Sequence, residues 1–152
     1  MSEANLDTTA VQRPGAFFGH ITQNVRNLAN EYFTTAQKGL TLDVGCGNGL
    51  FFASLPKPTG KLVGTDLDLS LLYESKQIFK DNEVANVSLV QGNVTTMPFE
   101  DKSFDNIFFL NTLINIPTDE IATILLNELM RICRPGGRIF VDIRNAGNPI
   151  LR

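Results

Sequence analysis

The sequence predicts an α/β fold, with a mostly parallel sheet that is covered by helices on both faces. An apolar run at 40–44 leads directly into a glycine cluster and then into a short helical segment. Segments with strand character then alternate with segments of helical periodicity, which favours a parallel sheet. The run at 104–110 is almost continuously apolar, as is typical of a strand that is buried on both faces.

Length and composition fit one globular domain. The chain has 152 residues, of which 43% are apolar and 19% are charged. Residues 1–13 are polar and aperiodic, so we expect a flexible N-terminal tail followed by one domain over 14–152. The net charge is −3 and there is no basic run, so the sequence gives no support for a nucleic-acid partner.

The expected compartment is the cytoplasm. No apolar stretch approaches the roughly 20 residues of a membrane-spanning helix, so we expect no membrane partner. The first residues have neither the basic start nor the apolar run of a signal peptide. Cys46 and Cys133 form no metal-ligand cluster, and reduced thiols are a simpler interpretation than a disulfide between them.

The first half of the chain contains two helices and three strands beside the short helix. One helical face comprises Val25, Leu28, Ala29, Tyr32 and Phe33, and Gly39 ends this helix before strand 40–44. Pro56 ends the short helix that follows the glycine cluster. Strand 61–66 precedes a helix that Asp68 or Ser70 caps, and its apolar positions are Leu71, Leu72, Ile78 and Phe79. A third strand is expected at 86–91.

The second half adds two strands and a long helix. After a loop at 92–103, the apolar run at 104–110 is the fourth strand. A helical stripe follows, comprising Ile121, Ile124, Leu125, Leu129, Ile132 and Cys133. Thr118 or Asp119 caps this helix, and the residues at 134–137 (Arg-Pro-Gly-Gly) end it before a fifth strand at 138–143.

Polar or small residues stand where four of these strands end, at 43–49, at Asp66, at 92–93 and at Asn111. Open α/β sheets bind ligands outside the carboxyl ends of their strands, so these residues are the candidate site. The turn at 43–49 has the pattern D-x-G-x-G-x-G, and its alternative interpretation is a glycine-rich turn without a ligand. A dinucleotide fingerprint, G-x-G-x-x-G, requires a third glycine where Leu50 stands.

Asp66 follows Gly49 by 17 residues, near the spacing at which an acid at a strand end reaches a ribose. A carboxylate accepts hydrogen bonds from both ribose hydroxyls, which explains the need for an acid. The alternative is a surface acid that caps the next helix, a role that Asp68 fills equally well.

These motifs, in this order, resemble the class I S-adenosylmethionine-dependent methyltransferases over about residues 40–143. The turn at 42–49 resembles motif I, 64–68 the next motif, 92–99 with 103–105 the adenine-binding loop and fourth strand, and 129–137 the turn before strand five. The resemblance implies a three-layer Rossmann-like methyltransferase core with S-adenosylmethionine as the cofactor and S-adenosylhomocysteine as the product.

The resemblance also implies roles for individual residues. Gly45, Cys46 and Gly47 approach the methionine part of the cofactor, Asp43 holds its ammonium group and Asn111 lies nearby. Asp66 binds the ribose, Leu67 lies beside the adenine, and Asn93 and Val94 belong to the adenine-binding loop. The family commonly has Asp where Asn93 stands, so this contact lacks charge assistance here.

The residues that act on an acceptor are unknown. Methyl transfer is an in-line displacement, and a base is needed only where the acceptor must first lose a proton. His20, the only histidine, lies where this family often builds a lid, and it is a hypothetical base or a surface residue. Phe17 and Phe18 line an acceptor pocket or belong to the core.

Three functions follow. The first is methyl transfer to a small-molecule acceptor, and the second is cofactor binding without transfer, as in a fragment or regulatory relative. The third is another nucleoside- or dinucleotide-binding α/β enzyme. Full-length members of the family continue with a helix and two more strands, for which 145–152 is too short. We therefore expect a C-terminally truncated domain with strand order 3-2-1-4-5. The fifth strand then lies at the edge, left open or covered by a second copy, as in a homodimer, or by a partner chain.

Overall fold

The computed structural model describes residues 16–35, 39–55 and 60–143. The predicted tail at 1–13 lies outside these residues. Five strands form one parallel sheet in the order β3-β2-β1-β4-β5, which confirms the predicted order. The strands are β1 (Leu40–Val44), β2 (Lys61–Asp66), β3 (Val87–Gln91), β4 (Phe104–Phe109) and β5 (Cys133–Val141).

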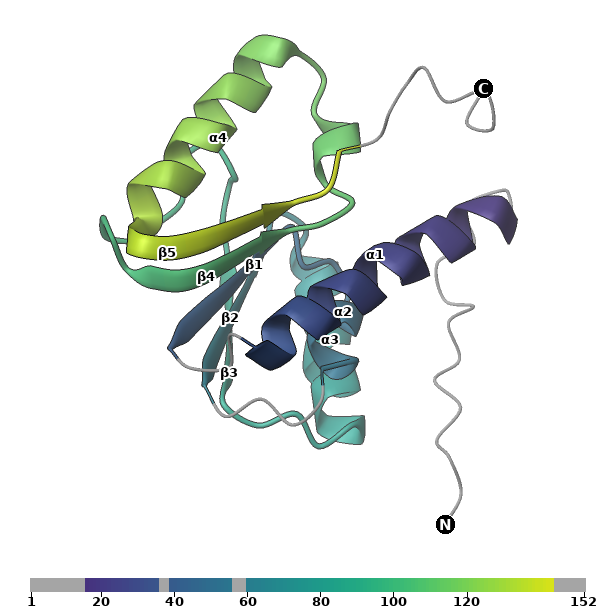
Figure 1. The fold of residues 1–152 in the computed structure, drawn as a ribbon. Helices are drawn as coiled ribbons and strands as arrows, with labels where there is room; N and C mark the ends of the chain where they lie inside the picture. Colours follow the sequence, from purple (N-terminus) through teal and green to yellow (C-terminus); the bar gives the residue numbers. More distant parts are fainter. Residues whose placement is uncertain (1–15, 36–38, 56–59, 144–152) are drawn as a thin grey trace.

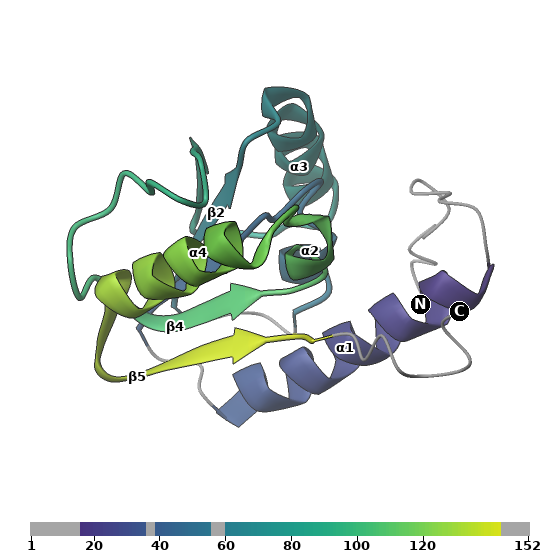
Figure 2. The same cartoon turned by 90° about the horizontal axis from the view of Figure 1, so that it is seen from above.

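Helices cover both faces of this sheet, as predicted. Helix α4 (Asp119–Ile132) lies on one face, and α1 (Ala16–Thr35), α2 (Leu50–Ala53) and α3 (Leu69–Asp81) lie on the other (Figures 1 and 2). A short 3-10 helix, η2 (Leu113–Asn115), joins β4 to α4. Within the described residues no helix is long and apolar enough to cross a membrane.

Each face of the sheet has its own apolar core. On the α4 face, Leu42, Val44 and Ile107 of the sheet pack with Leu125 and Leu129 of the helix. On the opposite face the core is largely aromatic, with Phe51, Phe52, Phe79 and Phe108 packed around Ala29 of α1. The central strands β1 and β4 are therefore buried on both sides, which explains their nearly continuous apolar sequence.

Strand register brings the strand ends together at one edge of the sheet. In β1 and β2, Asp43 pairs with Gly64 and Val44 with Thr65. In β2 and β3, Asp66 pairs with Gln91. The glycine turn after β1 therefore starts beside the last residues of β2.

The structure identifies the capping residues of two helices and shows that two apolar residues predicted to pack are exposed. Asp68 caps α3 by accepting from the amide of Ser70, and Thr118 caps α4. Leu28 and Ile124 were both predicted on packed helix faces, but they are 59% and 51% exposed. Neither side chain belongs to the two apolar cores of the sheet.

The start of β5 differs from the prediction. The residues at 134–137 were expected to form a turn before a strand at 138–143, whereas β5 already begins at Cys133. Phe104 pairs with Cys133 and Asn106 with Arg138, so the intervening residues bulge out of the ladder. Gly136 permits this bulge because its φ is 79°.

Candidate functional site

The candidate site lies at the carboxyl ends of β1, β2, β3 and β4. The chain leaves β1 toward β2 on one side, whereas β4 pairs with β1 on the other side. This reversal of strand order next to β1 is the point at which open α/β sheets bind their ligands. The polar strand ends that were predicted as a site therefore meet at one edge.

The backbone amides of the glycine turn are bound to the neighbouring strand. The amides of Gly45 and Cys46 both donate to the carbonyl of Thr65, at 2.8 and 3.0 Å. The amide of Gly47 donates to Oδ2 of Asp66 at 2.8 Å. These three N–H groups are already used, so a ligand that approaches the turn meets carbon atoms and carbonyls there.

The three glycines of the turn all have positive φ, at 70°, 54° and 79° for Gly45, Gly47 and Gly49. They differ in what surrounds them. A Cβ on Gly45 would collide with Thr112, and one on Gly49 would collide with Phe79. Around a Cβ on Gly47, no atom lies within 4 Å among the described residues. The turn is thus packed at both ends and open at its centre, as a ligand cradle requires.

Asp43, the acid that opens this turn, is only 3% exposed. Burial raises the pKa of its carboxyl from 3.8 to about 7, against the opposing effect of Arg26 and with a further increase from Asp66. A buried acid whose pKa is raised in this way is a candidate for binding a cation.

Arg26 is a residue that sequence reasoning missed. It lies on α1, and its positive charge acts on Asp43, seventeen positions further along the chain. Partial burial lowers the pKa of the guanidinium, and Asp43 raises it. Only the packing of α1 against the sheet reveals this pair, although an arginine next to Val25 on an otherwise apolar helix face is a weak signal.

Asp66 is a candidate site residue whose carboxyl also accepts a hydrogen bond from the glycine turn. One carboxyl oxygen accepts from Gly47, and the other accepts from the amide of Asp68 at 2.9 Å. The next residue, Leu67, is 65% exposed despite its apolar side chain. An acid can accept from the hydroxyls of a ribose, and an exposed leucine beside it can contact a planar base. This is the combination predicted for a nucleoside.

The loop after β3 carries Asn93 and Val94. Oδ1 of Asn93 accepts from both the amide and the hydroxyl of Thr95, at 2.9 and 2.8 Å. The carbonyl oxygen predicted to face an adenine amino group is therefore engaged, and the Nδ2 donor is the polar atom left for a ligand. Val94 packs against the core on the α4 face and holds the loop to the sheet.

Asn111 follows β4 with a φ of 55°, and its amide donates to Oδ1 of Asp142 at 2.6 Å. Its neighbour Thr112 lies against Gly45. The structure therefore places Asn111 beside the glycine turn, and its place near the methionine end of the cofactor stays a prediction. Sequence reasoning missed Asp142 and Thr112, because their partners are 31 and 67 residues away.

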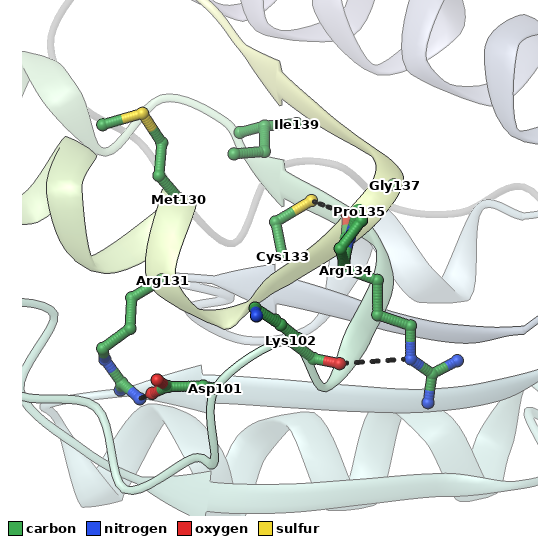
Figure 3. A pocket seen from close by; sticks show the side chains of 9 residues that line it. All are labelled: Asp101, Lys102, Met130, Arg131, Cys133, Arg134, Pro135, Gly137 and Ile139. Atoms are coloured by element: carbon green, nitrogen blue, oxygen red, sulfur yellow. Dashed lines mark hydrogen bonds and ion pairs between the residues drawn. The ribbon is translucent and has the colours of Figure 1, made fainter.

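Other predicted features lie elsewhere. Phe17, Phe18 and His20 are in the part of α1 whose side chains are outside the described set. A hollow of about 470 Å³ lies at the opposite end of the sheet, where α4 runs into β5 (Figure 3). Its lining includes Lys102, Met130 and Ile139, and none of the predicted site residues.

The site has no donor set for a metal, because no group of three His, Cys, Asp or Glu side chains comes together among the described residues. Cys46 and Cys133 are both free, so the disulfide alternative is excluded. The residues present fit an organic cofactor with a positive charge: a buried acid, an open glycine and a strand-end acid.

At the level of sequence, the methyltransferase domain family matches residues 42–141 of the 152-residue chain. A demethylmenaquinone methyltransferase of Geobacillus sp. (strain WCH70) is 35% identical over 107 residues, which cover 68% of this chain and 44% of the relative. One from Staphylococcus aureus (strain JH9) is 38% identical over 101 residues, covering 64% and 40%. The chain thus spans less than half the length of these curated relatives.

Solved structures share the fold. A Pyrococcus horikoshii OT3 protein superposes with a TM-score of 0.71 at 23% identity, covering 84% of this chain and 58% of that one. A SAM-dependent methyltransferase from Aquifex aeolicus superposes with a TM-score of 0.62 at 18% identity, covering 84% and 78%. At these identities the likeness concerns the arrangement of helices and strands.

Proposed function

Because the chain belongs to the class I S-adenosylmethionine-dependent methyltransferases, we propose that it binds S-adenosylmethionine and transfers the methyl group to a small-molecule acceptor. The observation that carries this proposal is the acidic, amide-poor glycine turn. Asp43 and Asp66 flank it, and the amides of Gly45, Cys46 and Gly47 are bound within the protein.

This turn favours a cationic ligand over a phosphate. Dinucleotide sites hold a pyrophosphate with free amides at a helix N-terminus. Here three amides are taken, and two carboxylates stand in their place. S-adenosylmethionine carries a sulfonium and an ammonium group, and both are attracted by carboxylates. The third function considered, a dinucleotide enzyme, is therefore disfavoured by charge as well as by Leu50.

The methionine end of the cofactor matches the charges of Asp43 and Arg26. We assign its ammonium group to Asp43 and its carboxylate to Arg26, which acts on the same acid from α1. Gly47 leaves room for the methionine part of the cofactor, between these two groups. Burial of Asp43 strengthens this attraction because the local dielectric constant is low.

The nucleoside end of the cofactor is assigned to the ends of β2 and β3. Asp66 keeps a lone pair on each oxygen for the ribose hydroxyls, and Leu67 offers an exposed apolar surface to the adenine. Asn93 would donate from Nδ2 rather than accept, since Thr95 occupies its oxygen. Val94 would complete the adenine side.

The cofactor supplies an electrophilic methyl group when it is bound. The residues of this chain bind and orient it: two acids set its position, and the glycine turn fixes how closely it approaches the sheet. Demethylmenaquinone, which names the similar enzymes of Geobacillus and Staphylococcus, is the first acceptor to test. The free thiols of Cys46 and Cys133 support the cytoplasm as the compartment.

Calorimetric titration with S-adenosylhomocysteine and with NAD tests the binding step. We expect saturable binding of the former and none of the latter, and the reverse would contradict the proposal. Transfer of a labelled methyl group to demethylmenaquinone and to a panel of other small acceptors tests the second step. Binding without transfer to any acceptor would favour the alternative function, a cofactor-binding domain without activity of its own.

A further inference from the structure

Asp142, just after β5, is hydrogen-bonded to Asn111, a residue of the candidate site. Asn111 has a φ of 55°, in the left-handed region, which asparagine adopts more often than most residues other than glycine. Its amide donates to Oδ1 of Asp142 at 2.6 Å. This is a short hydrogen bond to a carboxylate, the stronger kind of hydrogen bond in proteins. Asp142 thus holds the Asn111 backbone from the neighbouring strand.

The next residue carries this contact on to the glycine turn. Oγ1 of Thr112 donates to the carbonyl of Leu110 at 3.0 Å. It also lies 3.4 and 3.5 Å from the carbonyls of Val44 and Gly45. Gly45 has no side chain at the point where Thr112 sits. The backbone after β4 is therefore fitted against the backbone after β1.

Two exposed apolar side chains flank this contact in the sequence. Ile114, in η2, is 50% exposed, and Ile143, next to Asp142, is 79% exposed. Apolar side chains near Asn111 and Asp142 in the sequence are therefore accessible to solvent.

We propose that Asp142 is a positioning residue, whose carboxylate fixes the Asn111–Thr112 turn against the glycine turn in the arrangement that binds the cofactor. This inference rests on the proposed function for its ligand. It assigns Asp142 no contact with the cofactor: its effect passes through Asn111 and Thr112.

The test compares Asp142→Ala with Asp142→Asn, in which an amide oxygen still accepts from Asn111. Asp81→Ala, which removes an exposed acid at the end of α3, is the matched control. We expect Asp142→Ala to weaken S-adenosylhomocysteine binding about tenfold, as for a lost hydrogen bond to a charged group. The Asn variant should stay within about threefold of the wild type, and the control should be unchanged.

A nuclear magnetic resonance measurement tests the contact without any ligand. The amide proton of Asn111 should resonate at low field and exchange slowly in the wild type. Both properties should be lost in Asp142→Ala and largely kept in Asp142→Asn, which also serves if the Ala variant does not fold. An Asn111 amide that is insensitive to both substitutions would overturn the inference, as would Asp142→Ala with wild-type affinity or Asp142→Asn as weak as the Ala variant. If the wild type binds no S-adenosylhomocysteine, the proposed function fails, and the amide signal still decides whether Asp142 holds the turn.

Discussion

At the scale of single residues, the site depends on how burial changes the chemistry of Asp43. An exposed aspartate is ionised at neutral pH, whereas burial raises the pKa of this one to about 7. The acid is therefore only partly charged in the empty protein near neutrality. A cationic ligand shifts it toward the carboxylate, which links ligand binding to pH.

Affinity for S-adenosylhomocysteine should accordingly rise with pH up to about 7 and level off above it. Below that value, binding requires the loss of a proton from Asp43, so affinity should fall by up to about tenfold per pH unit. Calorimetry between pH 5.5 and 8.5 measures this. In Asp43→Asn the affinity should be low and much less dependent on pH, and an equally steep profile there would assign the titration to another group.

The same shift has a defined effect on stability. The folded pKa lies above the ordinary value of 3.8, so between about pH 4 and 7 the folded protein binds more protons than the unfolded chain. The contribution of Asp43 to the free energy of unfolding therefore falls as pH rises through this range. Asp43→Asn should show a smaller fall than the wild type in urea titrations of the empty protein.

Asp66 should matter for both the turn and the ligand. Asp66→Ala removes the acceptor of the Gly47 amide together with the proposed ribose contacts, and should weaken S-adenosylhomocysteine binding by about 1.5–3 kcal/mol. Asp66→Asn keeps an oxygen for the amide, so the turn should persist while part of the affinity is lost. Calorimetry measures the affinities. Unchanged affinity in a folded Ala variant would show that the ribose assignment is wrong.

Two glycines of the turn offer a matched pair of substitutions. Gly47→Val should abolish cofactor binding, because its side chain enters the open centre of the turn. Gly49→Val should instead lower the melting temperature further, because Phe79 already occupies that space. Both carry the cost of a β-branched residue at positive φ. Thermal unfolding and ligand titration of both variants separate the two effects. Retained cofactor binding in Gly47→Val would favour the alternative interpretation, a glycine-rich turn that binds no ligand.

At the scale of elements, α4 anchors the loop that bears Asn93 and Val94. Arg131 donates to the carbonyls of Met97 and Phe99, and it pairs with Glu128 and Asp101. Glu128 in turn accepts from the amide of Met97. Because no helix lies between β3 and β4 in this fold, the helix after β4 supplies the support that the loop needs.

Loss of this anchor should loosen the loop. Arg131→Ala should lower the free energy of unfolding by about 1–2 kcal/mol, a modest value because the side chain is one-third exposed and its ion pairs are screened. Amide exchange at 94–101 should become faster. Arg134→Ala, whose guanidinium is more exposed, is the comparison, and equal exchange in this loop for the two variants would contradict the assigned role.

At the scale of the whole molecule, β5 is the last strand in the order of the sheet and forms one of its edges. Among the described residues only β4 pairs with β5, which leaves the other side of this strand without a partner strand there. Met130 and Ile143, at 60% and 79% exposure, are apolar residues at the end of α4 and just after β5. A strand edge without a partner strand, near exposed apolar side chains, favours pairing with another chain.

We therefore expect reversible self-association that increases with protein concentration. Met130→Lys combined with Ile143→Lys should reduce it, because charges flanking a strand edge oppose pairing. Tyr73→Lys, on the exposed side of α3, is the control and should change nothing. Sedimentation velocity over a range of concentrations measures the change. A wild type that stays monomeric at high concentration, or a control as effective as the double variant, would contradict an interface at β5.

Local signals in the sequence determined most of the fold. The bounds predicted for β2 are those of the structure, and β1, β3 and β4 agree within a residue, because each strand is an apolar run that ends at a glycine, an acid or an amide. The early start of β5 at Cys133 was not predicted. Its bulge exists only because Phe104 and Asn106 of β4 offer partners on either side.

The candidate site, like the fold, was predicted only in part from the sequence. The sequence alone located the glycine turn, Asp66 and Asn111, because strand ends in a parallel sheet must meet at one edge. Only the tertiary structure showed that Asp43 is buried beside Arg26, that Asp66 binds Gly47, and that Asp142 holds Asn111. These contacts join residues that are 17 to 31 positions apart in sequence. Packing sets them, since burial and distance, rather than residue type, decide the charge of an acid and the partner of an amide.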